Sequence, residues 1–151
     1  MKNILFIIAL IFYTNAGAQT QQLDGQGPAL ADGETVPFAV VHHVPIFPGC
    51  EEAGNKRDCF RNSLQLHISK NFRYPKEAER KEIEGMISVL FTISKTGAIE
   101  NIMTKGSHQL LEDEVRRIIT LLPTMKPGNH KGELVNVPFA LPIRFDLCKA
   151  S

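Results

Sequence analysis

The chain of 151 residues contains no tryptophan, and its formal net charge at pH 7 is only +1. A nearly neutral chain gives no electrostatic reason to expect nucleic acid or an anionic membrane surface as a partner. Its one long apolar run, residues 4–13, is about half of the ~20 residues that a helix needs to cross a bilayer. The length is enough for one domain with its own core.

Signatures of catalysis and of metal binding are also missing. There is no G-x-S-x-G elbow for a serine nucleophile. His42 and His43 are adjacent, so on a strand they point to opposite faces and cannot easily hold one ion. The acidic residues 112–114 lie in the first turns of a predicted helix, where negative charge interacts favourably with the helix dipole. We therefore predict no enzyme, metal site or cofactor. A secreted metal-binding protein or enzyme that uses His42, His43 and Cys50 is the less favoured alternative.

The N-terminus has the pattern of an export signal. Lys2 precedes the apolar run, and Ala16 and Ala18 follow it in the A-x-A arrangement that signal peptidase prefers. We predict a signal peptide at residues 1–18, a flexible leader at 19–35 and one domain at 36–151, with the mature protein in the periplasm. The alternative is an uncleaved N-terminus that anchors the protein in the inner membrane, facing the periplasm.

Export makes a disulfide possible for the three cysteines. Cys50 and Cys59 flank the polar segment EEAGNKRD, so a bridge between them would close a short loop. Cys148 lies near the C-terminus and is left over. Pairing of Cys148 with Cys50 or with Cys59 stays open on the sequence alone.

Hydrophobic periodicity predicts an α+β domain: an antiparallel sheet of about three strands, with two main helices on one face. Strands are expected at 39–46, 86–93 and 98–105 and from about 134, with a turn at 94–97. Helices are expected at about 59–72, over a short stretch from Pro75, and after a Ser107 cap to about 122. Residues 124–133 are expected to form a loop.

Several segments, in this order, resemble the C-terminal domain of TonB proteins. FRYPKEAERKEIEGMISVLFTISKTGAIENI is similar to the front of that domain, with Tyr74, Pro75, Gly85 and Gly97 as the matching motif residues. LLEDEVRRIITLLPTMKPGNHKG resembles its helix and following loop, and VNVPFALPIRFDL its last strand. The lead-in VPFAVVHHVPIFPGCE resembles Bacteroidetes-type members. The resemblance covers about residues 36–147.

The resemblance implies a non-catalytic function in energy-coupled transport. TonB proteins carry energy from an inner-membrane motor to outer-membrane TonB-dependent receptors. Their C-terminal domain binds a short receptor peptide, the TonB box, by adding it as a strand to the sheet. The implied partner is therefore such a receptor. Inner-membrane motor proteins become partners if the N-terminus is uncleaved, in which case the chain is a full energy transducer.

Two prolines in the last strand indicate where a partner strand would bind. Pro138 and Pro142 are four residues apart, so the donors that they lack fall on the same edge of the strand. Proline blunts pairing at a sheet edge. The final part of the segment keeps its donors, and we predict that a partner strand binds there, at Ile143, Arg144, Phe145, Asp146 and Leu147. The alternative is that the donor-poor edge faces inward at a bulge, in which case the opposite edge binds the partner.

Overall fold

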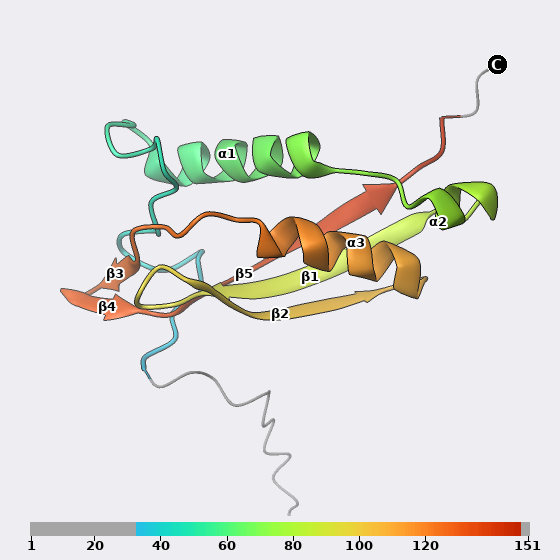
Figure 1. The fold of residues 1–151 in the computed structure, drawn as a ribbon. Coiled ribbons are helices and arrows are strands. Elements are labelled where there is room, and N and C mark those ends of the chain that lie inside the picture. Colours follow the sequence, from blue (N-terminus) through green and yellow to red (C-terminus); the bar gives the residue numbers. More distant parts are fainter. Residues whose placement is uncertain (1–32, 149–151) are drawn as a thin grey trace, which may run out of the picture.

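The computed structural model describes residues 33–148 (Figure 1). The predicted signal peptide and most of the predicted leader lie outside the described residues. The described elements are three helices and five strands, in this order: α1 (Lys56–Asn71), α2 (Lys76–Arg80), β1 (Gly85–Ile93), β2 (Ile99–Gly106), α3 (Gln109–Thr120), β3 (Gly128–His130), β4 (Glu133–Val135) and β5 (Val137–Phe145). Among these residues, no helix is both long and apolar enough to span a membrane.

The main sheet has three antiparallel strands in the order β2-β1-β5. β1 is the central strand, and its alternate residues Ile87, Val89, Phe91 and Ile93 are buried on one face. The helices α1 and α3 cover that face (Figure 1). The predicted α+β class, with an antiparallel sheet and helices on one side, is confirmed.

The hairpin between β1 and β2 forms as predicted, with one irregularity. Gly97 has φ +83°, and a Cβ there would lie 1.7 Å from the carbonyl oxygen of Met125, so the turn needs glycine. The pairing shifts register between Leu90 and Thr92, opposite Asn101, which has φ +52°. The shift is a β-bulge in β2, which disturbs the regular spacing of donors and acceptors along that strand.

The lead-in is not the strand predicted at residues 39–46. It forms only isolated bridges, His43 with Asn129 and Ile46 with Lys126. Its buried apolar residues are spaced two or three apart rather than strictly two, and they enter the core from a chain that turns: Val36, Phe38, Val41, Val44 and Phe47. The strand prediction for residues 39–46 is therefore wrong.

Two further predictions at the C-terminal half are corrected. The segment expected to be a loop contains β3, which pairs with β4 across a turn at Lys131 and Gly132, both with positive φ. The cap of α3 is His108, not Ser107. The Nδ1 atom of His108 accepts a hydrogen bond of 3.1 Å from the amide of Leu110, as a serine hydroxyl would.

Candidate partner-strand site

β5 lies at an edge of the main sheet, as the two prolines predict. Within residues 33–148, β1 is the only strand that pairs with β5, so one main-chain edge of β5 is open. On the helix side of this strand, Val137, Ile143 and Phe145 are buried, and Phe139 and Leu141 are partly buried. The alternation fixes the strand's orientation, and therefore which main-chain groups point outward.

The positions of the prolines show which residues direct their N–H and C=O groups to the open edge. Pro138 lies opposite Thr92 and Pro142 opposite Ser88. Antiparallel pairs alternate between hydrogen-bonded and non-bonded, and a residue without a donor fits only the non-bonded kind. The outward residues of β5 are therefore Pro138, Ala140, Pro142 and Arg144. This edge offers four carbonyl acceptors but only two N–H donors, at Ala140 and Arg144.

The structure narrows the edge segment predicted from sequence. β5 ends at Phe145, so Asp146 and Leu147 follow the strand. Ile143 and Phe145 direct their main-chain groups to β1. The amide of Leu147 already donates to Oε1 of Glu84 at 2.6 Å. Only Arg144 within the predicted segment belongs to β5 and faces outward, and whether a partner binds there stays a prediction.

The opposite edge of the sheet is occupied by side chains of α3. The Arg116 guanidinium donates to the carbonyl of Ile102 and to Oγ1 of Thr104, both at 2.9 Å. Glu112 accepts from the amide of Gly106 at 3.0 Å and from the hydroxyl of Thr104 at 3.3 Å. β2 therefore has both a bulge and side-chain partners on its outer main chain. Both features disfavour the addition of another strand there.

A groove runs between α1 and the open edge of β5. It has a volume of about 380 Å³ and is lined by one stripe of the helix and by the strand: Arg61, Leu64, Gln65, Ile68, Ser69, Phe139, Leu141, Pro142 and Ile143. Phe60 and Phe139 have ring centroids 5.2 Å apart, and Phe72 and Phe145 4.9 Å apart. The helix and the strand therefore run alongside each other in the same direction.

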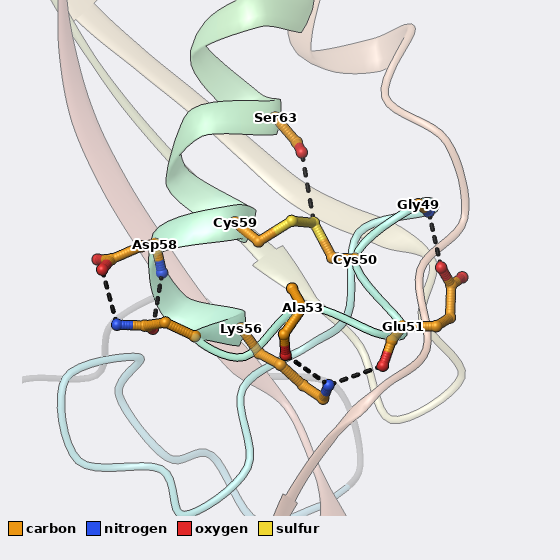
Figure 2. The surroundings of a disulfide bond; sticks show 9 residues. Gly49, Cys50, Glu51, Ala53, Lys56, Asp58, Cys59 and Ser63 are labelled. Atoms are coloured by element: carbon orange, nitrogen blue, oxygen red, sulfur yellow. Dashed lines mark hydrogen bonds between the residues drawn. A yellow bond between two sulfur atoms is a disulfide. The ribbon is translucent and has the colours of Figure 1, made fainter.

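The Cys50–Cys59 disulfide fixes the first turns of α1 (Figure 2). The two Cα atoms are 5.8 Å apart, within the usual range for a bridge. The Ser63 hydroxyl donates to Sγ of Cys50 at 3.4 Å, because a disulfide sulfur carries no proton. Cys148 is exposed and unpaired. Of the pairings that the sequence left open, the structure has the one that closes the short loop.

The other end of α1 is held by α3. Arg117 donates to the carbonyl of Asn71 at 2.5 Å and pairs with Glu114 at 2.6 Å. The same Glu114 accepts from the amide of Arg73 at 2.9 Å. The ion pair raises the pKa of Arg117. Both ends of the helix that borders the groove are therefore anchored to the rest of the domain.

The residues of the family motif have structural roles in the described chain. The Tyr74 hydroxyl donates to the carbonyl of Ile83 at 2.6 Å, and the Tyr74 ring packs against Phe145 at 5.7 Å between centroids. Pro75 is the N-cap of α2. Gly85 begins β1 with φ +155°, and a Cβ there would lie 2.2 Å from Oγ of Ser107. These residues shape the end of the sheet where β1 meets β5.

The histidines suspected of metal binding do not gather into such a site. The rings of His42 and His130 lie 4.3 Å apart, and among residues 33–148 no three His, Cys, Asp or Glu side chains could share an ion. A second groove of about 810 Å³ includes His42, His43, Lys56 and Arg57. Two of its three Lys and Arg side chains, Lys56 and Arg57, donate to main-chain carbonyls, so they support local structure.

Sequence reasoning missed the contacts that Glu112 and Arg116 make with β2 and the position of Arg61 in the groove beside β5. The acidic residues 112–114 were assigned to the helix dipole, yet Glu112 contacts the outer edge of β2. Periodicity predicts that a helix has a buried face, but it does not say which strand edge the neighbouring face will border. Arg61 lies one position beyond the buried Phe60, and no local signal relates it to β5.

Comparisons with known proteins agree with the sequence resemblance. Residues 70–147 match the family described as Gram-negative bacterial TonB protein C-terminal. A solution structure of the Helicobacter pylori TonB C-terminal domain (residues 179–285) is 26% identical, with a TM-score of 0.48, over 65% of this chain and 89% of that chain. A shorter version of it (residues 194–285) is 28% identical, with a TM-score of 0.40, over 60% and 97%. The search of curated proteins gives no match. The family match covers more than half of the chain, which therefore belongs to the TonB C-terminal domain family, with a role in TonB-dependent transport.

Proposed function

We propose that this protein is a non-catalytic peptide-binding module of the periplasm. It accepts the TonB-box segment of outer-membrane TonB-dependent receptors as an added strand on β5. The observation that carries the proposal is the contrast between the two edges of the sheet. Side chains of α3 bind the outer main chain of β2. Within residues 33–148, no side chain is hydrogen-bonded to the outward groups of β5.

The chemistry of the open edge favours an extended peptide. Four outward carbonyls, from Pro138 to Arg144, can accept hydrogen bonds from the N–H groups of a bound chain. Main-chain bonds of this kind supply affinity that depends little on sequence, and side chains on alternate residues supply specificity. The two prolines reduce pairing with unrelated strands, since they leave only the Ala140 and Arg144 donors.

Proline substitution at Ala140 is the sharpest test of the edge. Ala140 is exposed and faces Leu90 in a non-bonded pair, so proline removes an outward donor without removing a bond to β1. Losing one hydrogen bond of about 1 kcal/mol weakens binding about fivefold. We expect Ala140→Pro to weaken the binding of a TonB-box peptide in calorimetric titrations.

The matched control is Ala140→Val, which keeps the N–H at the same exposed position and should bind like the parent protein. Circular dichroism and thermal unfolding check that both variants fold. The proposal fails if the parent protein binds no TonB-box peptide at millimolar concentration. Equal affinity of the parent and the folded Ala140→Pro variant would rule out β5 as the acceptor.

A further inference from the structure

We infer that α1 forms a wall of the groove beside β5 and selects bound peptides by their side chains. This wall favours a peptide with a bulky aliphatic residue and, two positions away along the peptide, a carboxylate. The inference rests on the proposed function, because the groove would receive side chains of the strand added to β5. α1 lies almost wholly before the residues 70–147 that match the family. The residues of this helix therefore carry the inference, and the family match does not.

The helix and strand match in length over the groove. Residues 60–72 rise about 18 Å along the helix, and residues 139–145 extend about 20 Å along β5. An added strand lies about 4.8 Å from β5, and its alternate side chains point to the side that α1 occupies. Consecutive side chains on that side are about 7 Å apart. Two of them can therefore contact the lining of the groove.

The lining has an apolar centre and a cationic rim. Leu64 is buried at the base, and Ile68 and Leu141 are half-buried, so they can contact an aliphatic side chain. Arg61 is exposed, with its guanidinium carbon 5.8 Å from the centroid of the Phe38 ring. Among the described residues, no carboxylate pairs with Arg61, so its charge is available to a partner.

Both ends of α1 are fixed in the protein without a bound peptide. The disulfide holds one end of α1, and the bond from Arg117 to Asn71 holds the other. A helix fixed at both ends does not have to be ordered when the peptide arrives, and this lowers the entropic cost of binding. Gln65 and Ser69 lie on the same helical stripe and are exposed, so they can donate to or accept from a bound peptide.

A charge-swap titration tests the inference. The probes are two synthetic TonB-box peptides that differ at one residue, Glu or Lys, two positions from a central Leu, with the substitution made in turn on either side of that Leu. We expect the parent protein to prefer the Glu peptide about tenfold in one of the two placements. Arg61→Glu should reverse this preference. Lys70→Glu, a charge reversal on an exposed residue of α1 that does not line the groove, should leave it unchanged.

An aliphatic test complements the charge swap. Ile68→Ala should reduce the preference for Leu over Ala at the central peptide position, whereas Leu66→Ala should not, because Leu66 is exposed and outside the groove. The inference is overturned if Arg61→Glu changes the affinity for both peptides equally or not at all, while Ala140→Pro still weakens binding. In that outcome the proposed function stands. If the parent protein binds neither peptide, the proposed function fails and the inference fails with it.

Discussion

Arg116 of α3 donates a hydrogen bond of 2.9 Å to the main-chain carbonyl of Ile102, on the outer side of β2. The amide of Gly106 donates in the same way to Glu112. Side chains of α3 therefore occupy main-chain groups on the outer edge of β2, which is not the case on the outer edge of β5 within residues 33–148. A strand that approaches β2 must first displace charged side chains from the main-chain groups that it needs. A strand that approaches β5 meets no such competition within the described part of the chain. On the proposed function, this difference between the two edges favours β5 over β2 as the strand that accepts a partner.

Removal of the side chains that cap β2 should expose that edge without affecting β5. In a Glu112→Ala/Arg116→Ala variant, the amide of Gly106 loses its acceptor and the carbonyl of Ile102 its donor. We expect amide exchange at Gly106 to accelerate and the free energy of unfolding to fall by about 1–3 kcal/mol. Peptide affinity should be unchanged. A gain in peptide affinity in the folded variant would place the acceptor edge on β2, because the variant frees the main-chain groups of that edge.

Restoration of donors on β5 should promote self-association. A Pro138→Ala/Pro142→Ala variant gives the open edge two more outward N–H groups, which removes the blunting of that edge. Sedimentation velocity at rising concentration should show more dimer or larger species than the parent protein. Pro48→Ala replaces an exposed proline away from the sheet and serves as the control. The role assigned to the prolines is wrong if the double variant sediments like the parent.

The disulfide should contribute measurably to stability. Closing a loop with a sequence separation of 9 stabilises a folded domain by about 2–3 kcal/mol in the chain-entropy description. In a Cys50→Ala/Cys59→Ala variant, the free energy of unfolding should fall by that amount, so the variant should unfold at a lower denaturant concentration. Cys148→Ala, at an exposed and unpaired position, should not differ from the parent. Equal stability of all three proteins would contradict the role of the bridge.

The stability of the domain should fall at alkaline pH because of Tyr74. Burial, reinforced by Glu84, Asp146 and Glu79, raises the pKa of this phenol. In the unfolded chain tyrosine ionises near pH 10, so above that pH the unfolded state loses its proton first. The stabilisation by Tyr74 is fully present below the pKa that its phenol has in the unfolded chain. It is lost as the pH rises through the higher pKa that the phenol has in the folded protein.

This effect is measured by urea unfolding at a series of pH values from about 8 to about 11, a range that brackets the ordinary tyrosine pKa of about 10. We expect a steeper alkaline decline in the parent protein than in Tyr74→Phe. The second tyrosine, Tyr13, lies in the predicted signal peptide, and the chain has no tryptophan. The absorbance of the phenol in the chain without residues 1–18 therefore reports on Tyr74 alone. Identical pH profiles for the two proteins would contradict the burial effect.

Local sequence signals predicted much of the main sheet and its helices. Apolar residues at every second position predicted β1, although the opposite face is only half polar, and the SKTG turn predicted the hairpin. The two prolines, four residues apart, predicted that β5 lies at an edge of the sheet. The failures lie where tertiary contacts decide the outcome. The apolar lead-in enters the core without forming a strand, and β3 is defined by its pairing with β4 and by the bridge from Asn129 to His43.

The unequal edges could not be predicted from sequence, because they depend on side chains of α3 that reach across to β2. Glu112 and Arg116 look like ordinary surface residues of an amphipathic helix. The same holds for Arg61, whose position beside β5 depends on how the helix packs over the strand. Periodicity predicts which face of an element is buried, whereas the pairing of that element with a particular edge follows from the assembled fold.

The most direct test of the account is a residue-resolved NMR titration with a TonB-box peptide. If β5 accepts the added strand, the largest shift changes and new amide protection should fall at Ala140 and Arg144, the two outward donors of that edge. Residues of α1 that line the groove, Arg61 and Ile68, should shift with them. The account is contradicted if the changes cluster instead on the outer groups of β2, at Ile102, Thr104 and Gly106, or if no residue of β5 responds.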